Sequence, residues 1–435
     1  MTTTAAPPRA ALPARTMAVL AGTLFAAVST ELVPIGLLPQ LTAAFGVGPA
    51  RIGWWTSVYA LVVAVGAVPL TALVTRFGPR RALLGLIGAY VTSNLVVVAA
   101  GALDSFGLAL AARVLGGAAH AAFVSVVVAT AVRLSPRSRS GSAVTVVSSG
   151  VMAAFAFGVP LATAAGERFG WQAPFLGTAV LLVVLAGAAR VVLPPDGPRG
   201  RHRSGTPVVD PVTAASTDAS TDASTDARPA LPAGRTDRTA VVVVGAFSLL
   251  FLLGHTTGYT YVTELLQRAG APTPALGPLL FAFGLGSLVG VAVVARVADA
   301  HPATALRVAG IVLALATAGY VLPPSAVGPA AATVLLLVWG IAYGGLPAML
   351  QTAGLRVCAN PATAPAIVNS TTNAGIAAGA FLGGVVLPHG LAMLAATAAA
   401  VTALAVLLTF LPGTRPAART ADPGGHAARR SRSRR

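Results

Sequence analysis

Residues 29–40 read STELVPIGLLPQ and lie inside the first long apolar segment of the chain. Glu31 is the only carboxylate in the apolar interior of the first half. An ionised carboxylate is costly in hydrocarbon, so its presence there indicates a functional site by default. The alternative is that Glu31 lies near a helix end and reaches water. The depth of this residue in the membrane decides between the two interpretations.

The composition indicates an integral membrane protein. Of the 435 residues, 55% are hydrophobic and only 9% are charged, whereas about a quarter of a soluble domain is charged. The single cysteine, Cys358, excludes a disulfide framework and a multi-cysteine metal site. We expect no metal and no cofactor. An enzyme is not expected either, because the chain has no nucleotide-binding glycine loop and no sizeable soluble segment.

Apolar runs of about 20 residues, each long enough to span a bilayer, predict twelve transmembrane helices in two sets of six. The sets form bundles over 17–193 and 239–411. Between them lies a segment rich in Pro, Ser, Thr, Asp and Arg, which is too polar to fold. The predicted layout is an N-terminal tail (1–16), the first bundle, a disordered linker (194–238), the second bundle and a basic tail (412–435).

An internal repeat supports the division into six and six. Shifting the sequence by 224 positions superposes glycines over several helices without a gap, and it places His255 on Glu31. Parallel six-helix repeats put a substrate cavity at their interface, near the middle of the bilayer. The fold class is therefore an all-α membrane protein with two parallel six-helix pseudo-repeats. The superposed glycines are Gly46 and Gly270, Gly53 and Gly277, Gly66 and Gly290, and Gly116 and Gly340.

Arginines predict the orientation of the chain. They cluster after the second and fourth spans, in the central linker and in the C-terminal tail, while the opposite loops carry few. The positive-inside rule then places both termini and the linker in the cytoplasm. The formal charge of +17 is explained by these loops, so no nucleic-acid partner is expected.

Glu31 and Arg113 are candidates for proton coupling. At about 1.5 Å per residue, Glu31 lies roughly 21 Å from the cytoplasmic start of its helix, and Arg113 lies roughly 12 Å from the outer end of the fourth. Both are therefore embedded at similar depth, where they could pair if their helices touch. Proton relays of transporters use such groups, but a purely structural ion pair is equally compatible with the pattern.

Other polar residues within the spans predict a substrate cavity. His120 follows Arg113 by two helical turns and shares its face. The proposed lining residues are His120, His255, Tyr259, Asn369 and Asn373. The alternative for each histidine is a hydrogen-bonded core residue without a further role.

The fifth span contains residues typical of close helix packing: Gly150, Gly158 and Pro160. Small residues let helices approach closely, and proline loosens the backbone, as an interface between two moving halves requires. Ordinary packing is the alternative.

Four stretches resemble the major facilitator superfamily, and most closely its drug:proton antiporters, the arabinose-efflux and chloramphenicol-resistance type of exporter. Residues 30–39 are similar to the first-helix pattern of that branch, and residues 112–117 with His120 are similar to its fourth-helix motif. Residues 158–160 followed by 170–175 resemble its fifth helix and the start of the sixth, and 254–261 its seventh.

The loop after the second span is similar to the cytoplasmic gating loop of this family but departs from it. Arg76, Gly78, Arg80 and Arg81 are present, whereas Thr75 stands where the family usually has Asp. The second copy of the loop retains the acid as Asp299 and lacks the arginines. The missing acid puts the charge relay usual in the family in doubt for this chain.

The resemblance implies a monomeric secondary transporter in a bacterial plasma membrane, which exports a small organic molecule in exchange for protons. A drug or antibiotic is the expected substrate. Two alternatives remain open: a proton-coupled exporter of sugars or other metabolites, and a transport-inactive membrane receptor or scaffold.

Overall fold

The computed structural model describes residues 12–136, 139–196, 238–297, 302–347, 349–350, 353 and 363–410. Over these ranges every regular element is helical. Ten helices are long and apolar enough to cross a membrane, and two further apolar helices, in Ala303–Gly319 and Pro329–Gly344, are shorter. The twelve predicted spans are thus accounted for, and the predicted fold class is confirmed.

Over its described residues the first half contains eight α-helices, several of which begin at a proline or end at a glycine. Proline is favoured in the first helical turn because the amide it lacks would have no partner there. A five-residue π-helical turn, Ala154–Gly158, joins α6 to α7. The helices are α1 (Ala14–Gly36), α2 (Leu38–Phe45), α3 (Pro49–Val74), α4 (Pro79–Ala102), α5 (Phe106–Arg133), α6 (Ser140–Ala153), α7 (Val159–Phe169) and α8 (Gln172–Val192).

The second half repeats this order of long helices. Short 3₁₀ turns precede α12 and α17. The helices are α10 (Arg238–Tyr259), α11 (Val262–Arg268), α12 (Leu276–Val297), α13 (Pro302–Gly319), α14 (Pro329–Gly344), α16 (Thr363–Val386) and α17 (Leu391–Leu408).

The backbone reproduces the sequence repeat at the first helix of each half. The helix breaks at Leu37, between α1 and α2, and again at Tyr261, between α10 and α11. These two residues are 224 positions apart. Each short second helix is followed by a glycine of positive φ, Gly46 at 58° and Gly270 at 88°. Only glycine adopts this conformation without strain, so the repeat fixes the backbone as well as the pattern.

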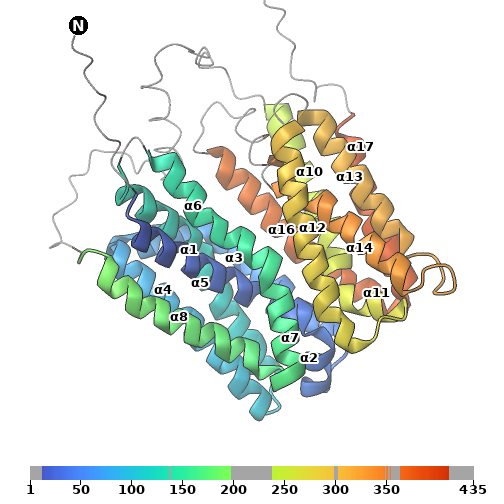
Figure 1. Cartoon of the computed structure of the whole chain (residues 1–435), viewed down its shortest axis with the longest axis horizontal. Helices are drawn as coiled ribbons and strands as arrows, with labels where there is room; N and C mark the ends of the chain where they lie inside the picture. Colours follow the sequence, from blue (N-terminus) through green and yellow to red (C-terminus); the bar gives the residue numbers. More distant parts are fainter. Residues whose placement is uncertain are drawn as a thin grey trace, which may run out of the picture.

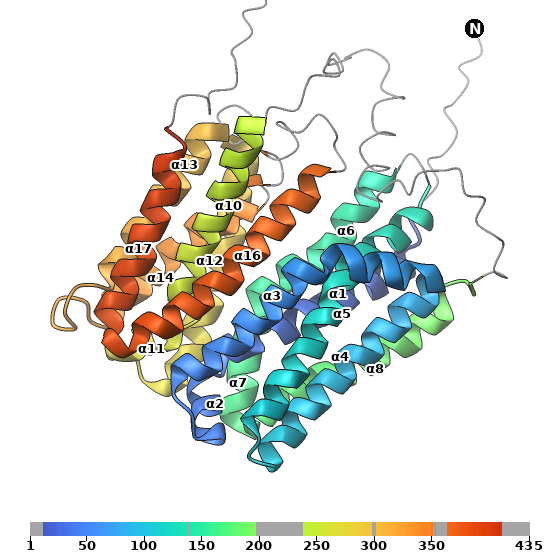
Figure 2. The ribbon, with the colours of Figure 1, turned by 180° about the vertical axis from the view of Figure 1, so that it is seen from behind.

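The two halves lie side by side (Figures 1 and 2) and meet along two pairs of helices. The helix α3 packs against α16, and α12 packs against α7 and the π-helical turn. Figure 1 shows α2, α7 and α11 gathered at one end of the molecule. At this end a Cβ on Gly384 would lie only 3.1 Å from the carbonyl oxygen of Ala50, so the glycine permits the halves to touch.

Buried apolar side chains form two clusters. One belongs to the first half alone and includes Leu20, Leu83 and Phe123, which come from α1, α4 and α5. The other extends across both halves, from Trp55 to Trp339. Because the second cluster is shared, the relative position of the halves depends on side chains from both.

Candidate functional site

The position of Arg113 follows from a proline in α1. Pro34 has no amide hydrogen, so the carbonyl oxygen of Thr30, four residues earlier, lacks its usual helical donor. Arg113 supplies the donor: Nη1 lies 3.1 Å from this oxygen, and Nη2 lies 3.3 Å from the carbonyl oxygen of Glu31. Arg113 is fully buried. The expected pairing is thus corrected: Arg113 binds the main chain of Glu31, not its carboxylate.

Two glycines of α5 bring Tyr59 close to Arg113. A Cβ on Gly116 would lie 3.2 Å from Cε2 of Tyr59, and one on Gly117 would lie 2.8 Å from the carbonyl oxygen of Tyr59. The guanidinium carbon of Arg113 then lies 4.4 Å from the centre of the Tyr59 ring, which is a cation–π contact. Residues 112–117 therefore place Arg113 and leave space for Tyr59.

Four side chains from four helices converge beside this contact. Nδ1 of His120 lies 3.6 Å from Oε2 of Glu31, 3.0 Å from the hydroxyl of Tyr59 and 2.8 Å from that of Tyr90. The two hydroxyls are 3.3 Å apart. The side chains of Glu31 and His120 retain 17% and 12% of their exposure. We call Glu31, Tyr59, Tyr90, Arg113 and His120 the polar cluster.

A hydrogen-bonded chain joins the polar cluster to α4 and α8. Asn94 donates to the hydroxyl of Thr30 at 3.3 Å and to that of Thr178 at 3.0 Å. Thr30 donates in turn to the carbonyl oxygen of Ala26. These bonds of the Asn94 side-chain nitrogen tie α4 to α1 and to α8, and so hold the part of α1 that carries Glu31.

The second half carries an aromatic cluster instead. His255 is 2% exposed. Its ring stacks on Tyr343 with centroids 3.9 Å apart and on Tyr259 at 5.0 Å. Trp339 donates its indole N–H to Nδ1 of His255 at 3.0 Å, and Phe283 lies 4.6 Å from Tyr259. We call His255, Tyr259, Phe283, Trp339 and Tyr343 the aromatic cluster.

The aromatic cluster contacts the first half through Tyr343. The ring of Phe155, in the π-helical turn, lies 6.3 Å from the Tyr343 ring, centroid to centroid. A second aromatic contact, between Phe157 and Phe281 at 5.8 Å, also crosses the interface. The aromatic cluster thus reaches the boundary between the halves at Tyr343.

The structure does not join the two asparagines to either cluster. Asn373 is buried and donates to the carbonyl and side-chain oxygens of Asn369, one turn earlier on α16, while Asn369 is exposed. Over the described residues no hydrogen bond links this pair to His255 or Glu31. Their part in a cavity stays a prediction.

The gating loop is held by a carboxylate that the sequence interpretation missed. Asp196, just beyond α8, accepts from the backbone amides of Arg80 at 3.0 Å and Arg81 at 2.9 Å, in the first turn of α4. Gly78, at φ 85°, lies so close to Asp196 that a Cβ would be 2.7 Å from Cγ. Helix N-termini favour such anions.

The loop arginines are used unequally. Arg80 also donates to the carbonyl oxygen of Arg190 at 2.7 Å, whereas Arg76 is exposed. Asp299 lies outside the described residues. Asp196 therefore supplies, from within the first half, an acid beside the loop where Thr75 has none.

The glycines of the fifth span pack helices of the same half. A Cβ on Gly150 would collide with the backbone of Ala21 on α1, and one on Gly158 would lie 2.8 Å from Oγ of Ser29. Pro160 follows the π-helical turn, consistent with the backbone amide that it removes. The close approach to the second half is made instead by Gly284 of α12, whose Cβ would lie 2.7 Å from Cα of Ala156.

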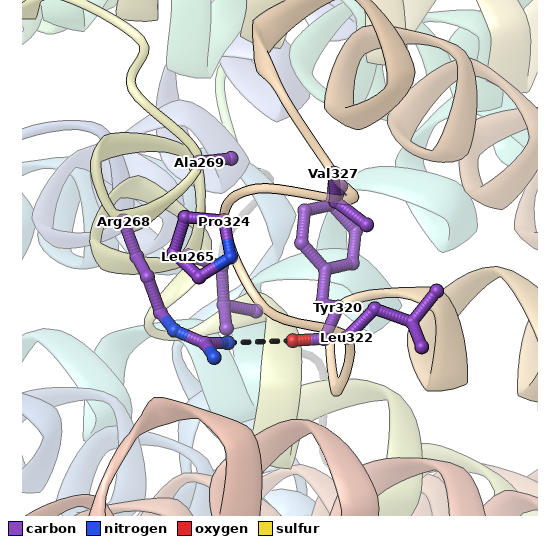
Figure 3. Close-up of a pocket in the computed structure, with 7 residues that line it drawn as sticks. All are labelled: Leu265, Arg268, Ala269, Tyr320, Leu322, Pro324 and Val327. Carbon is purple, nitrogen blue, oxygen red and sulfur yellow. Dashed lines mark hydrogen bonds between the residues drawn. The ribbon is translucent and has the colours of Figure 1, made fainter.

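A small pocket lies at the α11 end of the second half (Figure 3). Arg268 donates across it to the carbonyl oxygen of Tyr320, 2.7 Å away, just beyond the end of α13. A cation at a helix C-terminus satisfies carbonyl groups left without donors. Nearby on α11, partial burial raises the pKa of the Glu264 carboxyl. Arg268 therefore has a structural role, which is to cap the C-terminal end of α13.

Tyr59, Tyr90, Trp339 and Tyr343 are functional candidates that sequence reasoning missed. Tyrosine and tryptophan are common in apolar spans, so their types alone carried no signal. The internal repeat did contain a signal for Tyr59, because the 224-residue shift places the aromatic Phe283 on Tyr59 and Gly340 on Gly116. Among the described residues, no group of three or more His, Cys, Asp or Glu could hold a metal ion.

Comparison with known proteins agrees with this architecture. Residues 19–364 match the family model of the Major Facilitator Superfamily. The chain is 30% identical to chloramphenicol efflux pumps from two strains of Mycobacterium tuberculosis, over 90% of its length and 90% of theirs. Its fold is similar to that of the human organic anion transporter MFSD10 (TETRAN), with a TM-score of 0.62 and 18% identity, covering 93% of this chain and 100% of that one. The chain belongs to the Major Facilitator Superfamily of membrane transporters.

Proposed function

We propose that the protein exports a small organic molecule, a drug or antibiotic, in exchange for protons by alternating access. The observation that carries the proposal is the Glu31 carboxylate, which lies within a membrane-spanning helix and 3.6 Å from His120. An ionised carboxylate in this position costs free energy, so its presence indicates a functional role. The names of the chloramphenicol efflux relatives support the substrate class.

Each cluster has a distinct role in this proposal. Glu31 carries the proton. Arg113 acts on Glu31 indirectly: its bonds to the Thr30 and Glu31 carbonyls set the position of α1 and so of the Glu31 side chain. The substrate binds between the clusters, where the rings of His255 and Tyr259 supply a flat apolar surface.

His120 contributes a polar group to the same cavity, and Asn369 and Asn373 extend it along α16. The ring surface suits an aromatic or otherwise planar molecule, since apolar pockets with few polar groups bind such ligands. The rings and Asn373 are buried in the described state, so binding requires the side chains that cover them, including Tyr343 over His255, to move.

Alternating access requires the two bundles, residues 17–193 and 239–411, to rock about their interface. Contacts made by Gly284 and Gly384 would break and reform during this motion. The gating loop, residues 76–81, joins α4 to α3, which packs against α16 across the interface, and Asp299 belongs to the second copy of this loop in the sequence. In this proposal the protein is a monomer in a bacterial plasma membrane, and arginine placement supports both termini, the linker and the tail in the cytoplasm.

Efflux measurements in a drug-sensitive bacterium test the proposal. We expect cells that produce the protein to accumulate less chloramphenicol, or less of another drug in an antibiotic panel, and a protonophore to restore accumulation. Sugar efflux without drug resistance would favour a metabolite exporter. No transport of any tested compound by inserted protein would favour a receptor or scaffold.

A further inference from the structure

Three oxygen atoms compete for one nitrogen in the polar cluster. Nδ1 of His120 lies within 3.6 Å of the Glu31 carboxylate and within 3.0 Å of both tyrosine hydroxyls. A ring nitrogen has either one lone pair or one hydrogen, so it engages one partner fully at a time. The arrangement therefore has two hydrogen-bonded states that differ by the location of a single proton.

We propose that His120 exchanges the transported proton with Glu31, and that Tyr90 and Tyr59 stabilise the histidine after it has lost the proton. In one state His120 is an imidazolium with hydrogen on both ring nitrogens, and its Nδ1–H donates to Oε2 of ionised Glu31. In the other, the Nδ1–H bond has broken, an O–H bond has formed on Glu31, and the vacated lone pair accepts a hydrogen bond from a tyrosine hydroxyl. The inference rests on the proposed proton antiport and adds a second proton-carrying residue to it.

The two states are accessible because the tyrosines are already in place. The hydroxyl of Tyr90 is 2.8 Å from Nδ1 and that of Tyr59 is 3.0 Å away. The two hydroxyls also contact each other at 3.3 Å, so the one that is not bonded to the histidine still has a partner. No buried hydroxyl is stranded in either state, which keeps the cost of switching small.

The surroundings supply one fixed charge and no rival acid or base among the described residues. Glu31 comes from α1, Tyr59 from α3 and Tyr90 from α4, and Arg113 lies on α5 with His120 itself. The helix α6, which also packs on α5, has no ionisable side chain within residues 140–153. Arg113 bonds to backbone carbonyls, so the Glu31 carboxylate remains available to His120.

The pair also reaches the second half. The helix α1, which carries Glu31, contacts α11 and α12 of the second half, and Glu31 and His120 each keep some exposure. A substrate that enters between the clusters would therefore meet the pair directly. Substrate binding would favour one proton position over the other, which is what coupling requires.

Full-length protein in proteoliposomes tests the inference, with radiolabelled chloramphenicol as the probe. His120→Asn keeps a polar group near the position of Nδ1 but does not titrate. We expect the ratio of pH-gradient-driven transport to gradient-free chloramphenicol exchange to fall at least about tenfold in this variant, because Asn cannot carry the proton. Unchanged gradient-driven transport with an unchanged pH profile would overturn the inference alone.

Tyr90→Phe provides an independent test that keeps His120. The variant removes a bond that stabilises the neutral histidine, so the pH midpoint of transport should rise by roughly half to one unit. Tyr320→Phe is the matched control, because that buried hydroxyl bonds to the carbonyl oxygen of Ala332 in the second half. A midpoint that falls, or that stays the same in Tyr90→Phe, contradicts the role assigned to the tyrosine.

The wild-type protein separates the two levels of the account. If it shows no gradient-driven transport of chloramphenicol or any panel drug, the proposed function is wrong and the inference fails with it. If the wild type transports the drug and both His120→Asn and Tyr90→Phe behave like the wild type, the proposed function stands and the proton exchange with His120 is wrong.

Discussion

The two halves share a backbone but carry different chemistry at matching positions. Where the first half has Arg113, His120 and Tyr59, the 224-residue shift gives Leu337, Gly344 and Phe283. In both halves a glycine of the fourth span, Gly116 or Gly340, admits the aromatic side chain from the second span or its backbone. As we propose, the same scaffold thus holds a proton-carrying group in one half and a ring surface for substrate in the other.

This difference shows that the repeat preserves the packing of the helices, while the side chains at equivalent positions differ in their chemistry. Glu31 and His255 occupy equivalent positions, yet Glu31 meets His120 while His255 is enclosed by Tyr343, Tyr259 and Trp339. Changes in the first half should therefore alter proton coupling, and changes in the second half should alter substrate affinity.

The largest effect is expected from Arg113→Ala. It leaves the carbonyl oxygen of Thr30 buried without a donor and removes the cation–π contact with Tyr59. Loss of charged hydrogen bonds and exposure of an unsatisfied group should cost about 3 kcal/mol or more of stability. The apparent melting temperature in detergent measures this. A variant as stable as the wild type would show that Pro34 and Arg113 are not coupled.

The repeat-related glycines should differ in a predictable order. A Cβ on Gly340 would lie 2.5 Å from the carbonyl oxygen of Phe283, a backbone atom that cannot rotate away. A Cβ on Gly116 would lie 2.8 Å from the hydroxyl of Ser93 and 3.2 Å from a ring atom of Tyr59, which are side chains that can shift.

Gly340→Ala should therefore destabilise the protein by about 1–3 kcal/mol, as overpacking does, and Gly116→Ala by less. Thermal unfolding of the two purified variants, side by side with the wild type, gives the order. A larger loss of stability in Gly116→Ala than in Gly340→Ala would contradict the interpretation that the two sites share a backbone and differ only in the atoms around the glycine.

A smaller and more selective effect is expected in the aromatic cluster. Tyr343→Leu removes the ring stacked on His255 at 3.9 Å. Aromatic contacts contribute about 0.5–1.5 kcal/mol, so the KM for chloramphenicol should rise about threefold to tenfold with an unchanged pH profile. Tyr343→Phe keeps the ring and serves as the control. A shifted pH profile in Tyr343→Leu would mean that the two clusters do not divide their tasks.

The smallest effect is expected outside both clusters. Asp196→Asn removes the charge that accepts from the first amides of α4 but keeps an oxygen acceptor. It should cost about 1 kcal/mol or less of stability. Neither KM nor the pH profile should change, and transport assays on the same preparation check both. A large loss of transport would instead make Asp196 part of the gate.

The sequence predicted the architecture because its strongest signals are long and redundant. Apolar runs and a gap-free repeat both indicated two bundles of six helices. It also indicated Glu31, His120 and His255 as candidate site residues, since charged and titrating side chains are rare in apolar spans. The Pro34 and Gly116 positions lay within the motifs that carried the family resemblance, but their physical purpose became visible only in three dimensions.

The partners of these residues could not be predicted in the same way. Whether Arg113 meets the carboxylate or the carbonyl of Glu31 depends on helix rotation, which spacing along one helix does not specify. Asp196 lies 116 positions from Arg80 and follows two prolines in a polar stretch, so it resembled linker. Tyr59 and Tyr90 meet His120 through long-range packing of three helices, for which the sequence offers no local pattern.

The central claim is that Glu31 couples export to protons. Reconstituted wild type and Glu31→Gln should be compared for chloramphenicol transport driven by an imposed pH gradient and for exchange without one. The account predicts that Glu31→Gln loses gradient-driven transport to the level of empty liposomes and still exchanges substrate, because the amide keeps the shape of the side chain but carries no exchangeable charge. Gradient-driven transport at the wild-type rate in Glu31→Gln would contradict it.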